Sequence, residues 1–132
     1  MGFFRRALAL LGAAAVITAP LAQPLSAASQ RHPDVQTVRV KAAGPNTFDF
    51  DVTISSPYDT AQRYADAFRV MSKDGRVFGE RVLLHDHADE QPFTRDLYGV
   101  AISSGVRSVI VQARDMKYGY GGKTVEVALP GR

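Results

Sequence analysis

The sequence predicts an all-β protein, an antiparallel β-sandwich of about seven strands that follows an N-terminal signal peptide. Three observations lead to this prediction. Apolar residues recur at every second position over most of the chain, turn-forming residues separate these runs at intervals of about ten residues, and no amphipathic helical pattern follows the signal segment. Short strands at such regular spacing are typical of a sandwich.

Residues 1–28 have the composition of a secretory signal peptide. Arg5 and Arg6 precede an apolar run over residues 7–19, and small residues close the segment at Ala28, which suits cleavage near that position. The apolar run is shorter than the roughly 20 residues that span a membrane. We therefore expect a periplasmic or secreted protein with no membrane span in the mature chain. Since the sequence contains no cysteine, we expect neither disulfides nor a lipid-modified cysteine.

The mature chain is expected to form one domain, with a flexible lead-in over residues 29–34 and a single β-sandwich domain over residues 35–132. Removal of Arg5 and Arg6 leaves 14 of the 16 basic residues against 13 acidic ones, a formal net charge of +1. The two signs are interspersed and form no basic stripe, which argues against nucleic acid as a partner.

The first two strands flank a turn at residues 44–46. Val38 and Val40 alternate with basic residues, and residues 48–54 alternate Phe, Val and Ile with Asp and Thr. Residues two apart share a face of a strand, so the second strand is expected to have one buried and one solvated face. Residues 55–62 read as a connecting loop.

The third and fourth strands are predicted to form a hairpin. Residues 64–71 continue the alternation, although the alanines in this stretch leave a helix over residues 61–71 open. Asp74 and Gly75 mark the turn, because glycine adopts the positive φ that an Asp-Gly hairpin requires. Residues 77–84 form the return strand.

The last three strands are predicted over residues 93–102, 106–115 and 124–129. Between the fourth and fifth strands lies the loop 85–91, which begins HDHADE, and between the sixth and seventh lies the loop 116–122, MKYGYGG. Seven strands at this spacing indicate an immunoglobulin-like or fibronectin-like antiparallel sandwich, without the cysteine pair or tryptophan of an antibody-type domain.

Two loops of this sandwich are the candidate site. Successive loops alternate between the two ends of a sandwich, so loops 85–91 and 116–122 are expected at the same end. The residues predicted there to contact a partner protein or a small ligand are His85, His87, Glu90, Tyr118 and Tyr120. The leading hypothesis is a non-catalytic periplasmic module that needs no cofactor and binds an unknown periplasmic protein or small ligand.

The alternative hypothesis is a periplasmic copper- or zinc-binding protein. His-x-His presents two imidazoles on one face of an extended segment, imidazole suits both metals, and a thioether suits Cu(I). The predicted metal ligands are His85, His87, Glu90 and Met116. The plain alternative is a polar loop that bonds its own backbone amides and pairs its carboxylates with Arg81 and Arg95.

No catalytic residue is predicted. The chain has no thiol and no G-x-S-x-G nucleophile elbow, and the glycines of residues 119–122 lack the Lys-Ser ending of a phosphate-binding loop. An enzyme is therefore not expected.

The chain resembles a group of small exported proteins of alphaproteobacterial type in four segments, YADAFRV, DGRVFGERVLLHDH, EQPFTR and YGYGGKTVEVALP. The resemblance implies export and a β-sandwich over most of the mature chain, and it brings no known activity. Members of that group often carry a histidine near the glycine-rich loop, where this sequence has Lys117 and Tyr118. The loss of that imidazole weighs against a metal site.

Overall fold

The computed structural model describes residues 2, 12–20 and 29–132. The predicted signal peptide and its cleavage site near Ala28 fall largely on residues 1, 3–11 and 21–28, which lie outside the described residues. Residues 12–20 are exposed and contain neither helix nor strand. Over the described part of the chain, no helix has the length and hydrophobicity of a membrane span.

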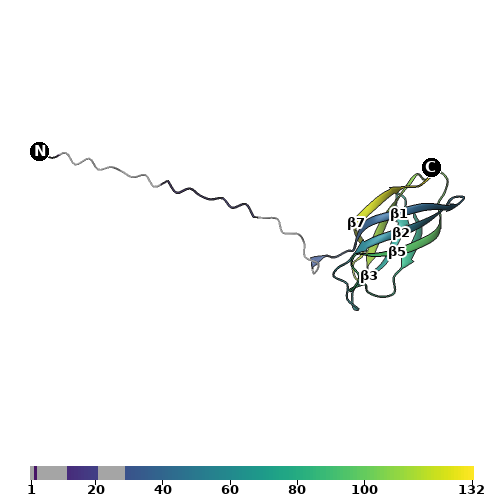
Figure 1. Ribbon diagram of the computed structural model, residues 1–132, viewed down its shortest axis with the longest axis horizontal. Helices are drawn as coiled ribbons and strands as arrows, with labels where there is room; N and C mark the ends of the chain where they lie inside the picture. The colour runs from purple at the N-terminus through teal and green to yellow at the C-terminus, as the bar shows by residue number, and fades with distance from the viewer. Residues whose placement is uncertain (1, 3–11, 21–28) are drawn as a thin grey trace.

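Seven antiparallel strands make up the domain (Figure 1). They are β1 (Asp34–Gly44), β2 (Thr47–Ser55), β3 (Ala65–Met71), β4 (Val77–Val82), β5 (Phe93–Ala101), β6 (Ser108–Asp115) and β7 (Gly119–Ala128). Two sheets form, one with the order β1-β2-β5 and the other with the order β4-β3-β6-β7. The predicted all-β sandwich is confirmed. A constant-type immunoglobulin domain places its fourth strand with the first, second and fifth, whereas here β4 pairs with β3.

Alternating side chains of the two sheets build the core. Along β2 and β6 buried residues alternate strictly with partly exposed ones, as a period of two requires. Phe50, Phe68 and Phe93 are among the largest side chains that are completely buried. The Asp-Gly hairpin is also confirmed, because Gly75 joins β3 to β4 with a φ of 91°.

Two expectations about elements are corrected by the structure. The open alternative of a helix over residues 61–71 is wrong, because β3 pairs with β4 on one side and with β6 on the other. The loop predicted over residues 116–122 ends at residue 118, because β7 begins at Gly119. Tyr120 is therefore a strand residue opposite Arg114, and it does not belong to a loop.

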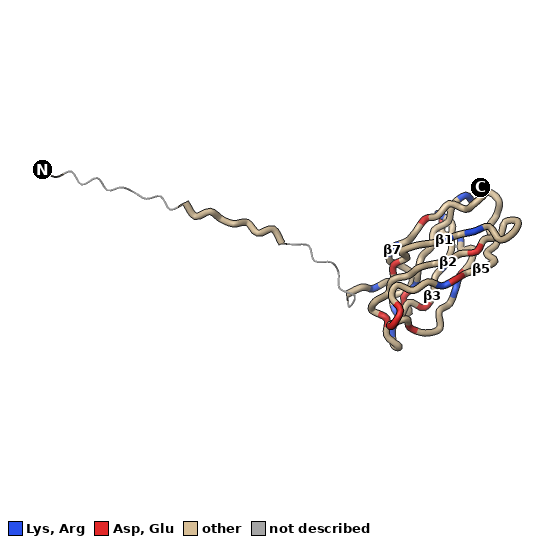
Figure 2. The backbone as a smooth tube through the Cα atoms, in the orientation of Figure 1, with Lys and Arg blue, Asp and Glu red and all other residues tan. Residues whose placement is uncertain are grey.

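One end of the sandwich, which we call the loop end, collects the lead-in of residues 29–33 and the connections 56–64, 83–92 and 116–118. The pairing of Ile54 with Phe93 and of Ala65 with Asp115 brings the strand ends beside these connections together. The HDHADE segment and the start of the MKYGYGG segment thus lie at the same end of the sandwich, as predicted. Figure 2 shows basic and acidic residues interspersed along the backbone of the domain.

Candidate functional site

Asp59, in the connection between β2 and β3, organises the HDHADE loop. Its carboxylate is buried and accepts hydrogen bonds from the backbone amides of Ala65 at 3.1 Å and His87 at 3.0 Å. Burial raises the pKa of Asp59, while the two amides and the hydroxyl of Ser56 work in the opposite direction. The carboxylate therefore fixes the backbone position of His87.

His87 is the buried histidine of the loop, with a relative exposure of 5%. Its ring stacks on Phe93 with a centroid distance of 4.0 Å and an interplanar angle of 11°. Among the described residues, its buried Nδ1 has no hydrogen-bond partner. Burial lowers the pKa of His87, and the charges of Arg95 and His85 lower it further against the opposing effect of Asp59 and Glu90. The imidazole is thus held neutral at pH 7.

His85 is exposed and lies beside His87, with 4.9 Å between the ring centroids. Its Nδ1 is 2.8 Å from the carbonyl oxygen of Asp86. A carbonyl only accepts hydrogen bonds, so Nδ1 carries the proton and Nε2 of the neutral ring keeps its lone pair. A backbone carbonyl that fixes the tautomer in this way is also typical of histidines that bind metals.

A hollow of about 150 Å³ lies next to the two histidines. Its lining residues are Arg81, Val82, Leu83, Leu84, His85, His87 and Arg95. The carboxylate of Asp96 pairs with Arg81 and that of Glu90 with Arg95, each at 2.9 Å, and the second pair confirms an arginine partner for the loop. Because each of the two arginines is paired with a carboxylate, they add little net charge to the hollow. The hollow also presents two imidazoles and the side chain of Leu84, which is 83% exposed.

A second buried carboxylate, Asp115 at the end of β6, organises the other half of the loop end. Its carboxylate accepts a hydrogen bond of 2.6 Å from the Tyr58 hydroxyl and forms an ion pair with Arg63 at 3.1 Å. It also accepts hydrogen bonds from the backbone amides of Lys117 and Tyr118, each at 2.8 Å. Burial alone raises the pKa of Asp115, but these donors outweigh it and hold the pKa below its usual value. Asp115 is therefore ionised at neutral pH.

The lead-in is attached to this network through Arg63. The guanidinium donates to the carbonyl oxygens of Gln30 and Arg31, each at 2.9 Å, and lies over the ring of Tyr118 at 4.9 Å. His32 places its Nδ1 3.1 Å from the carbonyl oxygen of Gly119. Residues 29–33 thus form part of the loop end.

The glycines of YGYGG make room for the lead-in. A Cβ atom added to Gly121 would stand 2.6 Å from the His32 ring, and one added to Gly122 would stand 2.2 Å from the Pro33 carbonyl oxygen. Both distances are too short for real contacts, so these positions require glycine because the lead-in crosses β7 closely.

The predicted site residues fall into three places. His85, His87 and Glu90 lie together around the hollow. Met116 and Tyr118, in the connection 116–118, are 40% and 43% exposed. Their connection is joined to Tyr64, whose backbone oxygen accepts a hydrogen bond from the Met116 amide and whose hydroxyl donates to the backbone oxygen of Leu84.

Tyr120 occupies the third place, on the outer face of the four-stranded sheet. Its hydroxyl donates to Glu80, and the guanidinium of Arg69 lies 3.8 Å from the centre of its ring. Burial raises the pKa of Tyr120, and the bond to Glu80 raises it further. The side chain is committed to this sheet face, away from the loop-end contacts.

Three of the four proposed metal ligands, His85, His87 and Glu90, do not form a group that could hold a metal ion. Among the described residues, no group of three or more His, Cys, Asp or Glu could hold a metal ion. Glu90 is paired with Arg95, and the backbone amide of Met116 is bound to the backbone oxygen of Tyr64. What remains for a metal is the pair of imidazoles.

Sequence reasoning missed the two carboxylates that build the loop end. Asp115 carried a usable signal, because it is in phase with the buried residues Val109, Val111 and Ala113 of β6. A carboxylate on the buried face of a strand needs hydrogen-bond donors or a cation, because an unpaired buried charge is unfavourable. Asp59 lies in an irregular connection and carried no such signal.

Comparisons with known proteins give one distant relative. The chain is 34% identical over 97 residues to a protein of Halomicrobium mukohataei named "Putative lipoprotein". The match covers 74% of this chain and 47% of the relative, so the chain spans about half the length of that protein. This relative is haloarchaeal, whereas the resemblance drawn from the four segments was of alphaproteobacterial type. The chain matches no protein-family model and no solved structure.

Proposed function

We propose that the protein is a non-catalytic exported module that binds a partner protein or a small ligand at its loop end. The observation that carries the proposal is the buried Nδ1 of His87, which lacks a partner among the described residues and belongs to a ring that lines the hollow. An unsatisfied buried polar group costs about 1–3 kcal/mol, and such defects concentrate at functional sites. The signal-like N-terminal segment and the name of the haloarchaeal relative support export.

The chemistry of the hollow suits a ligand with both apolar and hydrogen-bonding groups. Leu84 and Val82 are exposed apolar side chains, and His85 and Arg95 offer polar groups beside them. A few polar groups set into an apolar surface are the usual composition of a binding pocket. A small ligand would occupy the hollow alone, whereas a partner protein would extend across Tyr64 to the exposed ring of Tyr118.

The test is a titration of ¹⁵N-labelled mature protein with fractions of an envelope extract from its own host, followed by amide chemical shifts. We expect shifts in residues 81–95 that disappear in His85→Ala, a variant that should fold because His85 is exposed. Shifts that also include residues 116–118 indicate a partner protein. Ser104→Ala, in a turn at the opposite end, is the control. Shifts that persist unchanged in His85→Ala, or that centre on the opposite end, contradict the proposal.

A second candidate function, copper or zinc binding, is supported by the two neighbouring imidazoles. His85 retains a free Nε2 lone pair and His87 is neutral, and both are conditions that a metal ligand must meet. Two ring nitrogens supply half of a four-coordinate site, so water or an added ligand would complete it.

Calorimetric titration of the mature protein with Zn²⁺, Cu²⁺ and Cu⁺ tests this candidate. We expect micromolar or tighter affinity that weakens as pH falls below about 6.5, since protons then compete for imidazole. His85→Ala should abolish it and His32→Ala should not. Affinity no tighter than millimolar, or unaffected by His85→Ala, eliminates a metal at this pair.

A further inference from the structure

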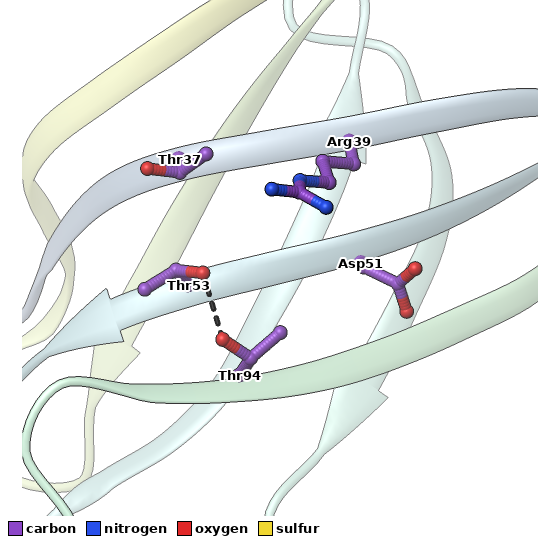
Figure 3. Close-up of a pocket in the computed structure, with 5 residues that line it drawn as sticks. All are labelled: Thr37, Arg39, Asp51, Thr53 and Thr94. Atoms are coloured by element: carbon purple, nitrogen blue, oxygen red, sulfur yellow. Dashed lines mark hydrogen bonds between the residues drawn. The ribbon is translucent and has the colours of Figure 1, made fainter.

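A second and larger hollow lies on the outer face of the three-stranded sheet, away from the loop-end hollow. It measures about 360 Å³ and is lined by Thr37, Arg39, Asp51, Thr53 and Thr94. All five side chains are polar, and they come from the three neighbouring strands β1, β2 and β5 (Figure 3). Pockets for small molecules begin at roughly 300 Å³, so the hollow has the size of a small ligand.

Strand register fixes the arrangement of these side chains. Thr37, Thr53 and Thr94 form one row across the sheet, and Arg39 lies opposite Asp51 in the next row. The hydroxyls of Thr53 and Thr94 bond each other at 2.8 Å. One wall of the hollow is therefore a row of hydroxyls, and the other carries two opposite charges.

The two charges differ in what they contact. Asp51 accepts a hydrogen bond from the Tyr98 hydroxyl at 3.2 Å. Arg39 is exposed and makes no side-chain hydrogen bond or ion pair with any other described residue, even though opposite charges directly across two strands usually attract. Figure 3 shows its guanidinium over the gap between β1 and β2. The hollow thus presents an unpaired planar cation beside hydroxyls.

We propose that this hollow binds a saccharide that carries a carboxylate, such as a uronic acid residue. A guanidinium pairs with a carboxylate through two parallel hydrogen bonds, and Asp51 together with the threonine row offers acceptors and donors to ring hydroxyls. Tyr98, 56% exposed and bonded to Asp51, places an aromatic ring at the border, where it can cover the apolar face of a sugar. Since every lining residue is polar, an apolar peptide would gain little there. This inference does not rest on the function proposed for the loop end.

The test is an NMR titration of the mature protein with trigalacturonate, with the neutral trisaccharide galactotriose and with acetate. We expect trigalacturonate to shift the amides around residues 37–39, 51–53 and 94–98. Arg39→Gln should weaken this binding at least tenfold, and Thr94→Val about threefold. Arg107→Gln removes the same charge from an exposed arginine outside the hollow and should leave binding unchanged.

Three results would overturn the proposal. Equal binding of trigalacturonate and acetate would mean that the site recognises only an anion, and equal binding of galactotriose would mean that the guanidinium is not used. If Arg39→Gln and Arg107→Gln weaken the binding of trigalacturonate equally, the net charge of the protein explains the loss and a specific site does not. Arg39 and Thr94 are both exposed, so their variants should fold, which a thermal melt verifies.

Discussion

Two buried aspartates give the loop end its shape, and their environments push their pKa values in opposite directions. Asp115 has a cation, Arg63, and three further donors, so its charged form is favoured. Asp59 has amide and hydroxyl donors, and desolvation outweighs them. At neutral pH the ionised Asp115 thus stabilises the folded state, whereas Asp59 carries a net desolvation cost.

Replacement of Asp115 by Asn should therefore destabilise the protein strongly. The change leaves Arg63 partly buried without its counter-ion, and loss of one partner of a buried pair costs about 3–5 kcal/mol. Urea unfolding at pH 7 measures the loss. Glu126→Gln breaks the exposed pair with Lys73 and should cost less than about 1 kcal/mol. Equal losses in both variants would show that Asp115 is not the centre of the network.

At the scale of elements, the lead-in and β7 depend on each other. The lead-in crosses β7 where Gly121 and Gly122 have no side chains, and Arg63 binds its carbonyl groups from the other side. Residues 29–33 contribute no strand pairing, yet they close the side of the sandwich at which the chain enters the domain. The glycine-rich segment is therefore explained by packing.

A double-mutant cycle tests this dependence. Gly121→Ala should lower the free energy of unfolding by about 1–3 kcal/mol, because the new methyl group overlaps the His32 ring. His32→Ala should restore most of that loss in the double variant, since the overlapping ring is gone. Gly105→Ala, where a Cβ meets open space, is the control and should be close to neutral. Additive losses in the cycle would contradict the contact.

The same elements show how far the sequence could predict the structure. Alternation along residues 48–54 and the Asp-Gly turn at Gly75 are local signals, and both were confirmed. The position of Tyr120 in a strand was missed, because its flanking glycines indicate a loop until the lead-in is packed against them. Likewise, the buried position of His87 depends on Asp59, 28 residues earlier in the chain. Contacts over such separations leave no periodic pattern in the sequence.

For the whole molecule, stability rests on the core between the two sheets, since the chain has no cysteine. All four buried polar or charged residues identified in the described part of the chain, Ser56, Asp59, His87 and Asp115, lie at the loop end. A change in pH therefore acts on buried groups at that end, while at the opposite end it acts on exposed carboxylates such as Asp74, whose hydrogen bond from Ser72 lowers its pKa.

The pH dependence of stability should accordingly have two windows. His87 has a lowered pKa in the folded state, so the unfolded chain binds more protons below about 6.5, and stability must fall as pH drops from 6.5 toward 5. One proton limits this slope to about 1.4 kcal/mol per pH unit. Asp115, whose pKa is also lowered, adds a loss below about pH 4, whereas Asp59, whose pKa is raised, adds stability as pH falls toward about 4. The midpoints of urea unfolding at pH 7.5, 6.0 and 5.0 measure the decline in the first window. His87→Phe should abolish this decline, because a phenyl ring can still stack on Phe93 but takes up no proton. If the decline between pH 6.5 and 5 is the same in His87→Phe and, as a second variant, His87→Gln, then the buried imidazole is not its source.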